Sequence, residues 1–223
     1  MKVKLISHSQ APYDDSLHKA SALDLVAYCA RVSNPSNQNN TETNEKLVKY
    51  LMKHKHWSPL EMVSVCLEVE TTRDIARQLL RHRSFSFQEF SQRYADPTQD
   101  LDFEIRDARL QDPKNRQNSI DIDNAELTEE WEWQQEQVIK AAQRAYSWAI
   151  KNGIAKEQAR AVLPEGNTLS RLYVNGTLRS WIHYIELRGA NGTQKEHIDI
   201  AYAVADVIAK IFPLAEEFKG KEI

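Results

Sequence analysis

Hydrophobic and polar residues alternate along parts of this chain, and the alternation predicts where its strands lie. In residues 62–70, every second position from Val63 to Val69 is valine or leucine. A two-residue period of this kind predicts a half-buried antiparallel strand. Two further strands are predicted, at residues 1–8 on a sheet edge and at residues 168–174, the latter followed by a turn at Asn175 and Gly176.

Apolar residues spaced three and four apart predict the helices. The longest runs over about residues 125–151, where Asn152 and Gly153 end it. A loop is predicted over about residues 84–94. An extended loop or strand is predicted around residues 101–106, followed by a polar linker that runs to Asn124. In chain order the helices are residues 22–32, a segment ending near residue 53, a segment capped by Thr71 or Thr72, residues 125–151, residues 155–162, residues 177–187 with Gly189 as a left-handed C-terminal cap, and a last helix from a capping box at residues 193–196 to Pro213.

These elements predict an α+β fold, with a mostly antiparallel sheet flanked by helices. At 223 residues the chain can bury one substantial core, so residues 1–223 are expected to form a single domain. The predicted helix at 125–151 is apolar on more than one side, which is typical of a helix that also packs against a partner subunit. We therefore expect a homotetramer with binding sites at subunit interfaces.

Composition narrows the class of protein. Hydrophobic residues make up 41% and charged residues 27%, as in ordinary soluble domains. We expect a cytoplasmic location and no membrane partner, because no apolar run is long enough to span a bilayer and no signal peptide is present. Cys29 and Cys66 suggest neither a disulfide framework nor a metal site, and both are expected to be structural. Any nucleotide cofactor must be held by side chains, since the chain has no Gly-rich phosphate loop.

Positive charge is concentrated in one stretch, although the net charge is only -3. Cations packed this closely repel each other, and an anion with several oxygens relieves the repulsion. The plain alternative is a set of solvated arginines near a helix C-terminus. The following loop favours a ligand, because it interleaves phenylalanines with hydroxyl groups. The cluster contains Arg73, Arg77, Arg81, His82, Arg83 and Arg93, and the phenylalanines are Phe85, Phe87 and Phe90.

The spacing Arg-His-Arg, seven residues, Ser, one residue, Arg resembles the defining motif of the flavin-dependent thymidylate synthases. It runs through Arg81, His82, Arg83, Ser91 and Arg93. Three further elements resemble the same family in the same order along the chain. They are the string from His56 through Ser58 to Glu61, the string Arg160-x-Val-Leu-Pro, and a helix carrying Arg179, His183 and Arg188.

The resemblance implies an enzyme that makes dTMP from dUMP, with FAD as cofactor and with NADPH and methylenetetrahydrofolate as co-substrates. It assigns Arg188 to activation of the pyrimidine. It assigns FAD binding to His56, Ser58, Arg81, His82, Arg83, Glu89, Arg179 and His183. It assigns dUMP binding to Gln78, Arg81, Glu89, Phe90, Ser91, Gln92, Arg93, Arg160 and Arg188. Met62 and Thr177 depart from the family pattern, and no role is carried over to them.

The assigned chemistry suits these residue types. Arginine forks bind phosphate oxygens in a bidentate manner. Neither cysteine lies in the Pro-Cys-His setting that the other class of thymidylate synthases requires, so activation must come from a fixed guanidinium that stabilises negative charge on the uracil ring. Direct and flavin-mediated transfer of the methylene group are both compatible with these residues.

Two other functions compete with this interpretation. A single-stranded nucleic-acid-binding module would use the arginines for phosphates and the phenylalanines for stacking. The mildly acidic net charge and the lack of a broad basic pattern argue against it, so no nucleic-acid partner is expected. The second competitor is a helical interaction protein in which the long Trp-containing helix is the functional surface.

Overall fold

A four-stranded antiparallel sheet forms the centre of the protein in a computed structural model that describes residues 1–12, 17 and 19–220. The strand order is β1-β2-β6-β3, with β1 (Lys2–His8), β2 (Ser64–Thr72), β6 (Leu169–Thr177) and β3 (Ser86–Glu89). The predicted edge strand at 1–8 and the predicted alternating strand are both confirmed. A small second sheet pairs β4 (Arg109–Gln111) with β5 (Ser119–Asp121).

The helices surround this sheet and confirm the predicted α+β class. In chain order they are α1 (Ala22–Ala30), α2 (Asn44–Lys53), α3 (Arg73–Leu79), α4 (Pro97–Asp100), α5 (Ala125–Lys151), α6 (Lys156–Ala159), α7 (Leu178–Arg188) and α8 (Lys195–Ala209). Short 3-10 turns add η1 (Arg31–Ser33), η2 (Pro35–Asn37), η3 (Ser58–Met62), η4 (Arg160–Val162) and η5 (Pro213–Phe218).

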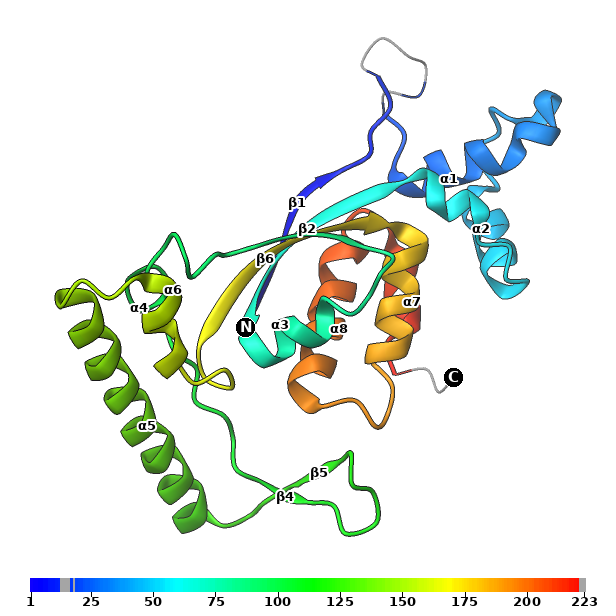
Figure 1. The fold of residues 1–223 in the computed structure, drawn as a ribbon. Coiled ribbons are helices and arrows are strands. Elements are labelled where there is room, and N and C mark those ends of the chain that lie inside the picture. The colour runs from blue at the N-terminus through cyan, green and yellow to red at the C-terminus, as the bar shows by residue number, and fades with distance from the viewer. Residues whose placement is uncertain (13–16, 18, 221–223) are drawn as a thin grey trace.

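The main core lies between the sheet and helices α7 and α8, which sit together on one face of it (Figure 1). Alternation in β2 sends Val65, Leu67 and Val69 into this core, where each is completely buried. Full burial of one such side chain contributes about 1.5–3 kcal/mol relative to leaving it exposed. Trp181 of α7 is also buried, and its indole Nε1 donates to the Val65 carbonyl over 3.0 Å. This bond fixes α7 against the central strand.

Helix α5 belongs to a second, smaller core and lies apart from α7 and α8 (Figure 1). Its Tyr146 and Ala149 pack against Ala159 and Leu163 near α6. Four large apolar residues of α5 are exposed outside this core: Trp131, Trp133, Val138 and Trp148. Their contact with a partner subunit stays a prediction. Within the described residues, no helix combines the length and apolarity needed to cross a membrane.

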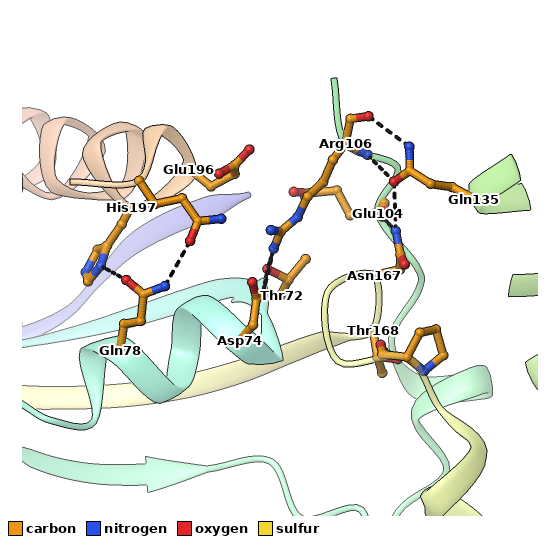
Figure 2. A network of polar contacts seen from close by, with 12 residues as sticks. Thr72, Asp74, Gln78, Glu104, Arg106, Gln135, Asn167, Thr168, Glu196 and His197 are labelled. Carbon is orange, nitrogen blue, oxygen red and sulfur yellow. Dashed lines mark hydrogen bonds and ion pairs between the residues drawn. The ribbon is translucent and has the colours of Figure 1, made fainter. Parts of the chain in front are cut away.

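A polar network joins α5 to the sheet (Figure 2). The buried Gln135 side chain exchanges two hydrogen bonds of 2.9 Å with the backbone of Arg106, and Asn167 donates to the Gln135 oxygen over 3.0 Å. The guanidinium of Arg106 continues to Thr72 and Asp74, at 2.7 and 2.6 Å. Thr72 is the N-cap residue of α3, as predicted. Its hydroxyl donates to the Asp74 carboxylate and does not cap a backbone amide.

Three details of the sequence-based fold are wrong. Asn175 and Gly176 form no turn, because β2 continues alongside them and keeps β6 extended to Thr177. The predicted loop at 84–94 contains the edge strand β3, and the predicted polar linker contains the β4–β5 hairpin. These strands have only three or four residues, too few to show a clear period.

Two predicted helix caps are also wrong. The capping box at 193–196 does not form, because α8 begins at Lys195 and Glu196 pairs with Arg109. Gly189 follows α7 in the right-handed conformation, with φ -81°. Its need for glycine is spatial, since a Cβ atom there would lie 2.7 Å from the Ile185 carbonyl oxygen and 2.9 Å from the Tyr202 ring.

Helix α2 ends in an unusual way for its sequence. The backbone amides of Lys55 and His56 donate to the carbonyls of Met52 and Leu51, as in a Schellman motif. Lys55 has φ 59°, a left-handed conformation that glycine normally occupies at this position. A side chain here costs about 1–2 kcal/mol.

Lys55→Gly should therefore stabilise the fold, by about 0.5–1 kcal/mol after the larger unfolded-state entropy of glycine is subtracted. The measurement is the urea midpoint of unfolding. Gly153→Ala is the matched control: Gly153, just beyond α5, has φ 77°, so alanine there should lower the midpoint. A lower midpoint for Lys55→Gly would show that the lysine side chain contributes more than its strain costs.

Candidate active site

The turn after α3 presents the first two residues of the Arg-His-Arg motif in opposite environments. Phe85 anchors the turn in the core, with its ring centroid 4.4 Å from that of Trp181. The hydroxyl of Ser180 in α7 adds a hydrogen bond to the Ser84 carbonyl, at 3.3 Å. Arg81 is consequently exposed, whereas His82 turns inward to the end of α7.

His82 and Arg188 form a fixed pair. The Nε group of Arg188 donates to His82 Nε2 over 2.8 Å. Because arginine can only donate, His82 must accept there and is a neutral imidazole protonated on Nδ1. Burial and the adjacent Arg188 cation lower the pKa of His82 to about 4. The Nη groups of Arg188 make no hydrogen bond to any described residue, so they remain available to a ligand.

Gln78 belongs to a second polar cluster, together with His197 (Figure 2). Its Oε1 is 3.2 Å from His197 Nδ1, and its Nε2 donates to Gln194 over 2.9 Å. His197 is completely buried and also contacts the hydroxyl of Tyr184 at 3.1 Å. The rings of His82 and Tyr184 meet edge to face at 5.1 Å, which connects the two clusters.

The expected cluster of five arginines around one anion does not form within the chain. Arg73 pairs with Glu89 at 3.5 Å, Arg93 with Glu157 at 3.2 Å, and Arg77 with Glu165. The other two members of the cluster, Arg81 and Arg83, form no ion pair with any described residue, and both are exposed. The carboxylates that neutralise the other three could not be matched to them from sequence, because the pairs are 16 to 88 residues apart.

The predicted dUMP residues fall into two sets. Gln78, Arg81 and Arg188 lie around the end of α7. The loop carrying Glu89, Phe90, Ser91, Gln92 and Arg93 lies along the edge strand, where several of these residues line a cavity of about 390 Å³. Arg160 belongs with this second set, because its Nε donates to the carbonyl of Glu157, the partner of Arg93. No hydrogen bond or ion pair between described residues joins the two sets.

The loop set contains an unused donor. Gln92 is buried, yet its Nε2 has no hydrogen-bond partner among the described residues. Glu89 accepts from the Ser170 hydroxyl at 2.8 Å, and the Phe90 amide donates to the Arg171 carbonyl at the same distance. The loop is therefore well fixed at its start, and an unsatisfied buried donor such as that of Gln92 normally marks a missing partner.

Most predicted FAD residues gather along α7 and η3. His183 meets the Trp57 ring edge to face at 4.7 Å, and Arg179 pairs with Glu61. Burial, with a smaller contribution from Arg179, lowers the pKa of His183. His56 and Ser58 are exposed on either side of Trp57. Arg81, His82 and Arg83 lie in the turn that the Ser180–Ser84 hydrogen bond joins to α7. Glu89 is the exception, since it lies with Arg73 at the sheet edge.

Sequence reasoning missed the buried polar residues behind the site. His197 occupies a core position of α8, in register with the buried Ile200, Ala201 and Val204. A histidine within an apolar stripe was the available signal, but the neighbouring Glu196 suggested a capping box instead.

Three comparisons relate the chain to known proteins. The family described as thymidylate synthase complementing protein matches residues 17–214. The chain is 48% identical over 213 residues to the probable flavin-dependent thymidylate synthase of Paramecium bursaria Chlorella virus 1, across 96% of both chains. It is 50% identical over 190 residues to the flavin-dependent thymidylate synthase of Synechocystis sp., across 85% of both. The solved UMP/dUMP methylase PolB from Streptomyces cacaoi, bound with 5-Br dUMP, has a TM-score of 0.80 and 28% identity, covering 97% of this chain and 93% of that one.

The neutral state of His82 makes stability depend on pH. Its pKa is about 4 in the folded protein and 6.5 in a free chain, so between these values the unfolded state binds more protons. The free energy of unfolding should therefore be highest above pH 6.5 and fall as the pH is lowered towards 4. His82→Asn should make this dependence shallower, as measured by urea unfolding between pH 8 and 4.5. Above pH 7 the free energy of unfolding of the variant and of the wild type should change with pH in parallel. An equal slope for both proteins below pH 6.5 would contradict the neutral state assigned to His82.

Proposed function

We propose that this chain, which belongs to the flavin-dependent thymidylate synthase family, converts dUMP to dTMP with FAD, NADPH and 5,10-methylenetetrahydrofolate. The observation that carries the proposal is the Arg188–His82 pair. It supplies a guanidinium whose Nε is held in place and whose Nη groups are unused. We assign the whole chain, residues 1–223, to one catalytic domain in the cytoplasm.

Arg188 is the proposed catalytic residue. A planar guanidinium can donate two parallel hydrogen bonds to the uracil ring and stabilise the negative charge that develops there. The neutral His82 imidazole fixes the orientation of Arg188 without adding a competing positive charge. Because protein groups hold the pair in place, little reorganisation is needed during the reaction.

A thiol nucleophile is not part of this mechanism. Cys29 and Cys66 are partly buried, and burial raises the pKa of both thiols. Raised pKa values keep them protonated at neutral pH, whereas a nucleophilic cysteine must be a thiolate. Electrostatic activation by Arg188 takes the place of covalent activation.

The residues along α7 and η3 fit a phosphate-bearing flavin. Arg81 and Arg83 are exposed cations without ion pairs among the described residues, and His56, Ser58 and His183 add further hydrogen-bonding groups. When bound, the flavin supplies the reducing equivalents that it receives from NADPH. The proposed FAD ligands are His56, Ser58, Arg81, His82, Arg83, Glu89, Arg179 and His183.

The two separate sets of dUMP residues support sites shared between subunits. Gln78, Arg81 and Arg188 form one half, and residues 89–93 with Arg160 form the other. We propose a homotetramer in which the two halves of each dUMP site come from two different subunits. The exposed Trp131, Trp133 and Trp148 of α5 give an apolar surface suited to such an assembly.

Mixing inactive variants tests the shared site. Arg93→Ala and Arg188→Ala each damage a different half, so assembly of both variants from a co-expressed mixture should restore some intact sites. Random mixing of the two subunit types predicts about a quarter of wild-type dTMP formation. The control is a mixture of the two variants that were expressed and purified separately, under conditions in which subunits do not exchange. A mixture no more active than these controls, or sedimentation as an active monomer, would contradict shared sites.

The function itself is tested by separating flavin reduction from dTMP formation. The purified protein should absorb as a flavoprotein, bleach with NADPH and form dTMP from dUMP and methylenetetrahydrofolate. Arg188→Ala should keep the first two properties and lose dTMP formation by about a hundred- to thousandfold, the usual cost of one preorganised electrostatic donor.

Two further variants sharpen this test. Arg188→Lys should restore little activity, because an ammonium group cannot reproduce the planar fork. Arg116→Ala, which removes an exposed arginine on the β4–β5 hairpin, should behave like wild type. Near-normal dTMP formation by Arg188→Ala would assign activation to another residue, and absence of flavin and dTMP formation in the wild type would refute the function.

A further inference from the structure

The side-chain amide of Gln78 is held at both ends by protein groups. His197 Nδ1 faces its oxygen at 3.2 Å, and its nitrogen donates to the Gln194 oxygen over 2.9 Å (Figure 2). An amide side chain presents a donor and an acceptor that are nearly identical in shape, so its orientation decides which hydrogen bonds a ligand can make. What fixes the orientation of Gln78 therefore bears on ligand choice.

The hydrogen-bond geometry gives these contacts a direction. The Nε2 group of Gln78 donates to the Gln194 oxygen, so the oxygen of Gln78 is the end that faces His197. Glu196, the residue before His197, is ion-paired with Arg109 of β4, and both side chains are largely buried. This ion pair joins the first turn of α8, which carries His197, to the β4–β5 hairpin.

The same direction continues through the rest of the cluster. Since Gln78 donates to Gln194, its oxygen faces His197 and must accept from an imidazole N–H. His197 is therefore protonated on Nδ1, and its Nε2 accepts from the Tyr184 hydroxyl at 3.1 Å. His197 and Tyr184 are 0% and 1% exposed, so water cannot supply alternative partners. A flipped Gln78 would place two donors or two acceptors against each other.

We propose that His197 is a positioning residue that locks the Gln78 amide in one orientation, so that it selects uracil over cytosine in the nucleotide. The two rings differ by an exchange of donor and acceptor at neighbouring atoms: uracil has an N3–H and an O4 acceptor, whereas cytosine has an N3 acceptor and an amino group. A freely rotating amide matches either pattern, and a locked amide matches one. The proposal rests on the assignment of Gln78 to dUMP binding.

The kinetic test compares dUMP as substrate with dCMP as competitive inhibitor. His197→Leu removes the donor that holds the Gln78 oxygen and keeps the site apolar. The ratio of the dCMP inhibition constant to the dUMP KM should fall about fivefold to tenfold, as expected for the loss of one net hydrogen bond. His197→Asn should restore most of the ratio, because an asparagine N–H can take the place of Nδ1–H. Gln78→Ala should lower the ratio as far as the double variant Gln78→Ala/His197→Leu does, because His197 acts through Gln78.

Tyr184→Phe is the matched control. It removes a buried hydrogen bond from the other nitrogen of the same imidazole, so a general loss of packing or polarity would appear in it equally. The proposal expects an unchanged ratio in this variant. It is overturned if His197→Leu leaves the ratio within twofold of wild type, or if Tyr184→Phe lowers it as much as His197→Leu does.

A measurement on the wild-type protein is independent of whether the variants fold. Nitrogen NMR of the full chain labelled with ¹⁵N-histidine distinguishes the two neutral tautomers of His197. The Nδ1–H form supports the locked direction, and the Nε2–H form overturns it. Wild-type dTMP formation is measured first: its absence refutes the proposed function, whereas normal dTMP formation with the wrong tautomer or an unchanged ratio refutes only the lock.

Discussion

The packing of α7 against the central strands is the constraint on which the site depends. Trp181, Ile182 and Ile185 are completely buried beneath the sheet, and the indole of Trp181 is bonded to the backbone of β2. β6 ends at Thr177 and α7 begins at the next residue, so the position of α7 is set at its start by the sheet. Burial of its apolar side in the core then also sets the positions of its polar residues. Arg188 at its end has little freedom of position, and the turn after α3 meets it through Phe85 and His82. The ligand-facing groups thus take their geometry from burial of their apolar neighbours.

Charge neutralisation shapes the site as strongly as packing. The chain concentrates arginines in one segment, and the fold then pairs three of them with carboxylates from distant segments. What remains is a small number of unpaired guanidinium groups near α7. Partly exposed pairs of this kind contribute only about 1 kcal/mol or less to stability. Their stronger effect is on selectivity, because they limit the places where an anionic ligand finds an unneutralised cation.

The sequence revealed features that are local or periodic, and it concealed those that depend on long-range contact. β2 was visible because its alternation spans a whole strand, and α5 because its length and its C-terminal Asn152 and Gly153 are local signals. β3 and the β4–β5 hairpin were missed because strands this short have no measurable period and form only against a partner. The family motifs identified candidate ligands residue by residue. They could not show that Glu89 would pair with Arg73, or that the dUMP residues would separate into two sets, because both facts arise from tertiary arrangement.

The buried polar residues behind Gln78 are the clearest case of a sequence choice that packing alone would not make. An apolar residue at position 197 would continue the stripe of α8 and avoid the cost of burying an imidazole, since a polar group without its partners loses about 1–3 kcal/mol. The histidine is tolerable only because both ring nitrogens find partners, the Gln78 side chain and the Tyr184 hydroxyl, and Gln78 is held in turn by Gln194. The neighbouring Glu196 pairs with Arg109, so the β4–β5 hairpin is joined to the start of α8 beside this cluster. A network of this kind has few acceptable alternatives, and this rigidity is what a site needs if it is to distinguish two rings of nearly equal shape.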